Sequence, residues 1–379
     1  MTETRRPHRR RRVVLLVVLV LILGFVFAAG RIKLSEYALV PGDALSVSGL
    51  ITVPKDKAHP LNGHVLLTDV GVDDVTLLTW LPDQLNGNTD VVPQGDLTGN
   101  LPTEEFDAQG VVDMSESQMT AEAVALRQLG YPVPEHDAGV TVYVVDPSSP
   151  AWHVLHVGDV VTAVDGVPTP NTAALVAAVH THGPGERITL RVGTITNPTN
   201  GHDVSLVLGS AVENGKRVPI IGIGAPDVPI PGMGTQPVYD YPFPVQISAD
   251  GIGGPSAGLA FTLGVINTLS GGNLTGGRTV AATGTIHPDG TVGDVGGVAQ
   301  KTVAVERAGA TLFLVPPQEY STAKSKATSG LTVVAVRSLG DAIAVLEQHG
   351  GSAGSASVGP PAGAGGHSVP YDWQDAPWT

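Results

Sequence analysis

The first pattern along the chain is an apolar run over residues 13–29, interrupted only by Gly24. With Gly30 it makes 18 residues, or about 27 Å of helix, which is enough to cross the hydrocarbon core of a bilayer. Six arginines precede the run, so we expect a single-pass membrane protein with residues 1–12 in the cytoplasm and the body outside it. A cleaved signal peptide is the competing interpretation, because residues 28–30 (AAG) resemble a cleavage site, but the apolar region of a signal peptide is usually shorter.

After this run, strand-like segments and segments with helical spacing follow one another along the chain. Short strand-like runs separated by turn signals predict a small β-rich module over residues 34–115, in which we find no chemistry. Apolar residues at helical spacing predict a helix over 117–130, with Ser115 or Ser117 as its N-cap. The next segment is rich in strand-like runs and contains one predicted helix, at 172–180.

Helices and strands alternate over residues 240–349, which predicts an α/β or α+β domain. The expected elements are helices at 256–269, 298–308 and 339–348 and strands at 279–283, 311–315 and 331–336. Residues 350–379 are dominated by Gly, Ala, Ser and Pro, so we expect a disordered tail.

Charge is distributed unevenly along the chain. The formal net charge is −14, but residues 1–33 hold eight basic residues and one acid, so the other 346 residues carry 13 basic and 34 acidic residues. A body this acidic argues against a nucleic-acid partner, which needs a basic surface. The chain has no cysteine, which excludes disulfides, iron–sulfur clusters and thiol catalysis, and its twelve histidines show no HExxH motif. We therefore expect no metal and no cofactor.

Three short motifs follow one another in the middle of the chain: SPA at 149–151, GDVV at 158–161 and VDG at 164–166. A strand-like run precedes them, and a helix follows. This region resembles a PDZ domain of the bacterial type, which we place at 116–210. The resemblance implies that an extended peptide binds as an added strand, with its terminal carboxylate held by backbone N–H groups.

Leu129, Gly130 and Tyr131 are the candidates for that carboxylate-binding loop. The alternative is that these residues only end the preceding helix, because glycine is the usual residue just past a helix C-terminus. The sequence leaves both interpretations open.

A glycine-rich loop at 251–258 (GIGGPSAG) places Ser256 just before a predicted helix. Glycines bring backbone N–H groups close to a ligand, and the first N–H groups of a helix are unpaired, so an oxyanion formed at Ser256 would meet donors. A serine in this position also commonly caps a helix. Lys301 lies on a later helix among apolar neighbours, where burial favours the neutral amine that a general base needs, although most such lysines are simply solvated.

Both residues belong to an ordered series of blocks. These are GPSAG at 254–258, ATG at 282–284, VGDVGGVAQK at 292–301 and AGA at 308–310. The series, over residues 240–349, closely resembles the proteolytic domain of Lon-type serine proteases. The resemblance implies that Ser256 is the nucleophile, that Lys301 is the general base and that Thr283 helps to orient the lysine.

Two features depart from that family. Gly253 stands where many Lon proteases have an acidic residue, and whether Asp250 substitutes for it is open. No GxxxxGK[ST] motif is present, so ATP-driven unfolding is not encoded in this chain. The order of anchor, PDZ domain and proteolytic domain instead resembles a bacterial family of membrane-anchored PDZ proteases.

Two other interpretations compete with a Ser/Lys protease. GPSAG also fits the GxSxG elbow of α/β hydrolases, but these need a later catalytic histidine, and only His287, His349 and His367 follow Ser256. The other is a catalytically inactive, membrane-tethered PDZ adaptor. The presence of both Ser256 and Lys301 argues against it.

The sequence therefore predicts an α+β multidomain chain: an N-terminal transmembrane helix, a small β-rich module, a PDZ domain and a Lon-type α/β proteolytic domain. The expected function is that of a membrane-anchored, ATP-independent serine endopeptidase that cleaves extracytoplasmic polypeptides, with the PDZ domain assisting substrate docking. The physiological substrate is left open. Lon domains often form rings, so a homo-oligomer is compatible with the resemblance.

Overall fold

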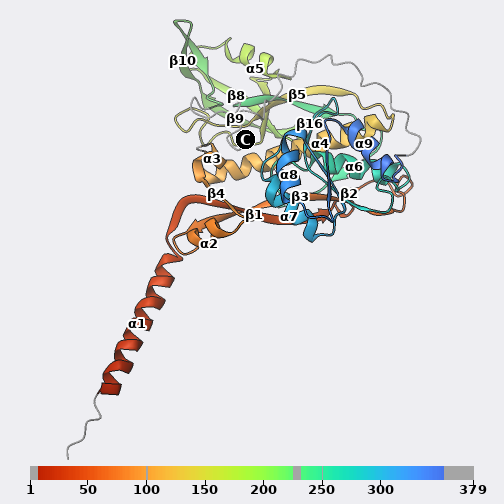
Figure 1. The fold of residues 1–379 in the computed structure, drawn as a ribbon. Coiled ribbons are helices and arrows are strands. Elements are labelled where there is room, and N and C mark those ends of the chain that lie inside the picture. Colours follow the sequence, from red (N-terminus) through yellow and green to blue (C-terminus); the bar gives the residue numbers. More distant parts are fainter. Residues whose placement is uncertain (1–6, 100, 225–231, 250, 354–379) are drawn as a thin grey trace, which may run out of the picture.

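The computed structural model describes residues 7–99, 101–224, 232–249 and 251–353. Helix α1 (Pro7–Ala29) projects away from the rest of the chain (Figure 1). Its segment Arg11–Ala29 is long and apolar enough to cross a membrane, and almost all of it is exposed. This helix is a candidate membrane span or signal sequence.

A six-stranded sheet forms the centre of the body. Its order is β18-β17-β14-β3-β1-β4. The strands are β1 (Lys33–Ser46), β3 (His64–Thr76), β4 (Asp90–Pro93), β14 (Thr279–Ala282), β17 (Leu312–Val315) and β18 (Thr332–Ala335). Strands β3, β14, β17 and β18 are parallel to one another, and β1 pairs antiparallel with β3 and β4.

This sheet corrects the expected separate β-rich module at 34–115. The early strands are continuous with the proteolytic sheet, because β3 pairs with β14 from His64↔Thr279 to Leu66↔Ala281. Side chains alternate between the two faces: Val65 and Leu67 enter one core and Leu66 the other. Strand patterning identifies which face is buried, but it does not identify the partner strand.

Helices cover both faces of the sheet. Helices α4 (Thr103–Gln128), α6 (Gly258–Leu269) and α9 (Leu339–Gln348) contribute to one core. Helices α7 (Val298–Arg307) and α8 (Tyr320–Lys326) contribute to the core on the other face.

Helix α4 begins earlier than expected, at Thr103 instead of residue 117. Ser117 therefore lies inside the helix and does not cap it. The first half of α4 lacks a clear apolar stripe because it packs on two sides. Val112 clusters with Val160 of β6 and with Ile195 in the turn after β8, whereas Met114 belongs to the core of the first sheet. Figure 1 shows α4 running between the two sheets.

The second sheet has the path β12-β5-β6-β8-β9. Its strands are β5 (Glu135–Val142), β6 (Asp159–Val164), β8 (Arg187–Thr194), β9 (Asn197–Val207) and β12 (Met233–Tyr239), with β7 (Val167–Pro168) beside β6. Helix α5 (Thr172–Val179) packs on it and is capped by the Asn171 side chain, which accepts the N–H of Ala174. The expected boundary at residue 210 is too early, because β12 completes this sheet by pairing along β5.

The remaining elements are short. They are η1 (Val47–Gly49), β2 (Ile51–Thr52), α2 (Trp80–Leu85), α3 (Gln94–Thr98), β10 (Gly209–Glu213), β11 (Lys216–Ile220), β13 (Gln246–Ile247), β15 (Thr285–Ile286), β16 (Val292–Gly293) and η2 (Pro317–Glu319). The predicted tail from residue 354 onward lies outside the described residues.

Candidate active site

Ser256, Thr283 and Lys301 lie together at one point of the fold. The Lys301 amine donates to Ser256 Oγ at 2.9 Å and to Thr283 Oγ1 at 3.2 Å. Ser256 precedes α6 by two residues, Thr283 follows β14, and Lys301 lies in the first turn of α7. Three segments of the chain therefore deliver one side chain each to the same place.

The approach of α7 to the sheet depends on a glycine. Gly297 precedes α7 with φ of 66°, and a Cβ there would lie 2.5 Å from the Val70 side chain of β3. Glycine adopts this left-handed conformation at little cost and leaves room for the contact. Lys301, four residues later, is thereby held against the sheet.

Lys301 is buried, with only 3% of its surface exposed. Burial lowers the pKa of Lys301 from 10.5 to about 8, because a charged amine loses its hydration inside the protein. The carboxylates of Glu319 and Asp69 oppose this shift. Since the pKa remains near 8, an appreciable fraction of Lys301 is neutral in mildly alkaline solution and able to accept a proton.

Thr283 connects the lysine to the backbone of the serine. Its hydroxyl accepts from Lys301 and donates to the Ser256 carbonyl oxygen at 3.2 Å. The Gly284 N–H donates to the same carbonyl at 2.9 Å. Two donors thus fix the backbone that carries Ser256.

The first N–H groups of α6 are only partly used. Gly258 N–H donates to Pro255 and Leu259 N–H donates to Gly284. The N–H groups of Ser256 and Ala257 have no hydrogen-bond partner among the described residues. Ala257 occupies the N-cap position and Ser256 makes no side-chain cap, so the capping interpretation of Ser256 does not describe this loop. Unpaired N–H groups beside a hydroxyl suit an oxyanion.

Helix α4 supports the same loop from outside the region of the sequence motifs. The Gly110 carbonyl accepts the Gly254 N–H at 2.8 Å, and Ser117 Oγ donates to the Pro255 carbonyl at 3.1 Å. The sequence offered Ser117 only as a candidate helix cap and did not indicate Gly110. The Ser117 contact spans 138 positions and carries no local motif. Asp250, the candidate acidic residue, lies outside the described residues.

The candidate carboxylate-binding loop, Leu129–Tyr131, already uses its backbone N–H groups within the protein. Their N–H groups donate to Ala125, Arg127 and Leu126, respectively. Gly130 has φ of 81°, the left-handed conformation typical of a helix C-terminus. The structure thus places these residues at the end of α4, and their N–H groups are not free to hold a carboxylate.

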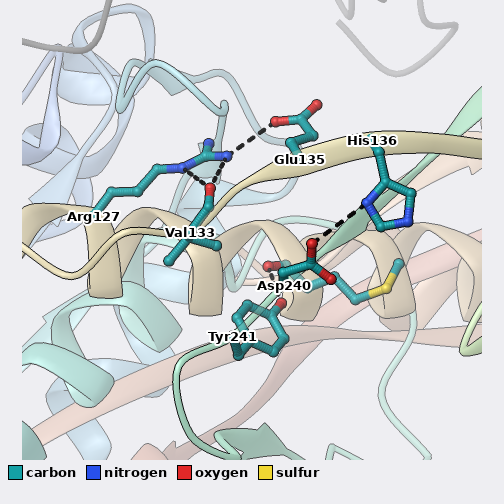
Figure 2. Close-up of polar contacts among 7 residues, drawn as sticks. Arg127, Val133, Glu135, His136, Asp240 and Tyr241 are labelled. Atoms are coloured by element: carbon teal, nitrogen blue, oxygen red, sulfur yellow. Dashed lines mark hydrogen bonds and ion pairs between the residues drawn. The ribbon is translucent and has the colours of Figure 1, made fainter.

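Neighbouring contacts join the end of α4 to the second sheet, as Figure 2 shows. Arg127 donates to the Val133 carbonyl at 2.9 Å and to Glu135 at 3.1 Å. Tyr241, just after β12, donates to the Met119 carbonyl of α4 at 3.1 Å. Strand β12 pairs along the edge of β5, and the Tyr241 hydrogen bond joins the chain after β12 to α4.

The geometry supports an α/β hydrolase or a metal enzyme less well than a Ser/Lys protease. His287 lies in the turn between β15 and β16, and no histidine is hydrogen-bonded to the Ser256 side chain in the described part of the chain. His180 and His182 form a His-x-His pair at the end of α5, where His182 contacts Asp165 and Glu186. Within the described ranges, no group of three or more metal-ligating side chains was found that could hold an ion.

Comparison with known proteins identifies two domains. Residues 127–194 match the family model of the PDZ domain, and residues 247–347 match that of the Lon protease (S16) C-terminal proteolytic domain.

Similar solved structures include PDZ domains of SdrC-like proteins. The one from Listeria monocytogenes is 25% identical over 22% of this chain and 84% of its own, with a TM-score of 0.20. The one from Listeria innocua is 26% identical over 22% and 89%, with a TM-score of 0.20. A solution structure from Geobacillus thermodenitrificans is 27% identical over 22% and 91%, with a TM-score of 0.19.

The two family matches define the class of the chain. It is a mixed helix-and-strand protein that combines a PDZ domain with a Lon-type serine protease domain.

Proposed function

We propose that this chain is a membrane-anchored serine endopeptidase that cleaves extracytoplasmic polypeptides without ATP, using Ser256 as nucleophile and Lys301 as general base. The observation that carries the proposal is the 2.9 Å contact between the Lys301 amine and Ser256 Oγ. A nucleophile within hydrogen-bond distance of its base, in a loop with unpaired N–H groups, is the arrangement that acyl transfer requires.

The reaction follows from the positions of these groups. Neutral Lys301 takes the Ser256 proton as Oγ attacks a peptide carbonyl, and the N–H groups of Ser256 and Ala257 stabilise the oxyanion. Charged Lys301 then protonates the leaving amine, which leaves an ester on Ser256. Water, deprotonated by Lys301, hydrolyses the ester and restores the serine. Thr283 keeps the amine directed toward Oγ throughout.

The remaining parts of the chain define where this chemistry acts. Helix α1 would hold the body on the extracytoplasmic side, since the basic residues precede it. The second sheet would assist substrate docking, as PDZ domains do. We infer that the proteolytic unit includes residues 33–128 as well as 240–349, because their strands share one sheet.

The test compares the full chain in detergent with its Ser256→Ala variant. Each is incubated with an unfolded protein, without ATP, and the products are read by mass spectrometry. Ser270→Ala is a matched control, because the Ser270 hydroxyl is buried and has no partner in the described structure. Cleavage by wild type and Ser270→Ala, together with none by Ser256→Ala, supports the proposal.

Two results would contradict it. Cleavage that survives Ser256→Ala would remove Ser256 as the nucleophile. A folded wild-type chain that cleaves nothing, even with the PDZ domain engaged by an added peptide, would favour the inactive adaptor.

A further inference from the structure

An exposed apolar surface lies beside the point where α1 meets the body. We call it the junction patch, and it consists of Ile32, Leu77, Leu78, Trp80, Leu81 and Leu85. Outside α1, fifteen large apolar side chains are exposed in the described part of the chain, and six of them belong to this patch. Scattered exposed apolar residues are ordinary, but a cluster marks an interaction surface.

The junction patch is held at the level of the last turn of α1. Only three residues separate α1 from β1, so the connection spans roughly 10 Å at most. The Leu77 N–H donates to the Ile32 carbonyl at 3.0 Å, which ties the turn before α2 to this connection. Leu78 Cδ2 lies 3.6 Å from where a Cβ on Gly30 would stand. Figure 1 shows α2 beside this junction.

The chemistry of the patch suits the boundary of a bilayer. Tryptophan has an apolar ring with one polar N–H and is enriched at membrane–water interfaces. Within α2 the polar residues Asp83 and Gln84 lie between Leu81 and Leu85, as in a segment that rests in the interface without crossing it. Arg31 stacks over the Phe27 ring at the end of α1, where a cation can meet lipid phosphates.

Continuity with α1 identifies the occupant of this surface. The side chains of α1 from Val13 to Phe27 are themselves exposed and apolar. The junction patch adjoins the end of this helix in space, because Leu78 lies beside Gly30 and the Leu77 N–H donates to the Ile32 carbonyl. A bilayer that surrounds α1 therefore reaches the patch. No other described part of the chain covers these six side chains.

We propose that the junction patch enters the headgroup region of the membrane crossed by α1, so that lipid contacts the body at a second site. This inference rests on the membrane anchor of the proposed function. A single helix lets a tethered domain turn about its connection, whereas a second contact fixes its tilt. The Ser256 site is then held in one orientation relative to the bilayer, which favours substrates that are themselves membrane-bound or close to its surface.

Because the chain has no cysteine, single cysteines can report depth without background. The full chain is reconstituted into phosphatidylcholine vesicles with a nitroxide label on Leu81→Cys, Val18→Cys or Val212→Cys. Val212 is 71% exposed on β10, at the end of the body away from α1 in Figure 1, and serves as the aqueous control. Accessibility to oxygen, which partitions into lipid, is compared with accessibility to a water-soluble nickel chelate.

We expect a several-fold higher oxygen-to-nickel ratio at position 81 than at 212, with the highest ratio at 18. A lipid-like ratio at 18 with an aqueous ratio at 81 overturns the junction patch but leaves the anchor intact. An aqueous ratio at 18 as well contradicts the anchor and therefore both proposals. Dipolar broadening at 81 with low oxygen access would assign the patch to a second copy of the chain and would also overturn the proposal.

Discussion

Two glycine-containing turns at helix ends carry the candidate binding sites of this protein, and they differ in how their N–H groups are used. At the start of α6, the N–H groups of Ser256 and Ala257 have no partner among the described residues. At the end of α4, the N–H groups of Leu129, Gly130 and Tyr131 all donate to carbonyls of the helix.

The two ends of a helix explain the difference. The first N–H groups of a helix have no carbonyl before them, so a start leaves donors free. A left-handed glycine after the last turn folds the following N–H groups back onto the helix, so an end of this type uses its donors. Glycine in a sequence motif therefore does not by itself indicate an anion site. The direction of the helix decides whether donors remain.

The strongest way to break this comparison is to remove Lys301, the proposed general base, which has no counterpart at the end of α4. Lys301→Met should lower kcat/KM for peptide cleavage by at least ~10³-fold, because Ser256 loses its proton acceptor. The free energy of unfolding at pH 7 should rise by roughly 1–3 kcal/mol, because a buried amine is replaced by an apolar chain of similar length. Urea unfolding and peptide kinetics check both, with the exposed Lys324→Met as control. Retained cleavage would contradict the role of Lys301.

The pH dependence of kcat/KM and of stability tests whether Lys301 acts as the base. Burial lowers the pKa of Lys301 to about 8, and only the neutral amine is a base, so kcat/KM should rise about tenfold per pH unit below 8 and level off above it. Between about 8 and 10.5 the unfolded chain binds a proton that the folded chain lacks, so stability should increase with pH by about 1.4 kcal/mol per unit. The difference between wild type and Lys301→Met isolates this term. The stability advantage of Lys301→Met over wild type should therefore shrink as the pH rises from about 8 to 10.5, and an advantage that grows over this range would contradict the assignment.

Thr283→Val tests the orientation of the amine. The hydroxyl both accepts from Lys301 and donates to Ser256, so its loss should lower kcat by about 10–100-fold with little change in KM, a barrier increase of roughly 1.4–2.8 kcal/mol. The lysine also loses an acceptor, so the alkaline rise of the rate should move to lower pH. Thr285→Val is the matched control, because the Thr285 hydroxyl is buried and has no partner in the described structure. Equal losses in both variants would indicate a packing effect only.

The sequence predicted those features of the fold and the site whose residue pattern lies within one segment of the chain. The bounds of α9 were predicted to the residue, and those of α7 and β14 to within one, because their apolar periodicity is uninterrupted. The contact between Ser256 and Lys301 was expected from the resemblance to the Lon-type proteolytic domain.

Two other features that join distant segments were not predicted. The pairing of β3 with β14 depends on strands that are far apart in the chain, and neither strand encodes its partner. The contact of Ser117 with Pro255 also joins two segments far apart in the chain. For Leu129–Tyr131 the sequence left two interpretations open, because a short motif fits two geometries. The hydrogen bonds of their N–H groups to the last turn of α4 favour the helix end.

Ser117→Ala measures how far α4 supports the α6 loop. The lost hydrogen bond to the Pro255 carbonyl is worth about 1 kcal/mol, so kcat should fall roughly fivefold while KM changes little. Ser115→Ala in the same helix is the control, because its hydroxyl bonds only to the Val111 carbonyl of α4. An unchanged kcat in Ser117→Ala would mean that the loop keeps its geometry without this contact.

Gly130→Ala should have the smallest effect on cleavage. It decides whether the end of α4 binds a carboxylate or only ends the helix. Nothing lies within 4 Å of a Cβ added at Gly130, so the only cost is the left-handed backbone, about 1 kcal/mol of unfolding free energy. Gly340→Ala, inside α9 and with only an ordinary contact to Ser338, should instead stabilise by up to ~1 kcal/mol. Neither variant should alter the ratio of cleavage rates for a substrate with a free C-terminal carboxylate and the same substrate amidated. If Gly130→Ala selectively slowed the carboxylate substrate, the N–H groups of this turn would have to open toward a ligand, and the distinction between the two helix ends would no longer hold.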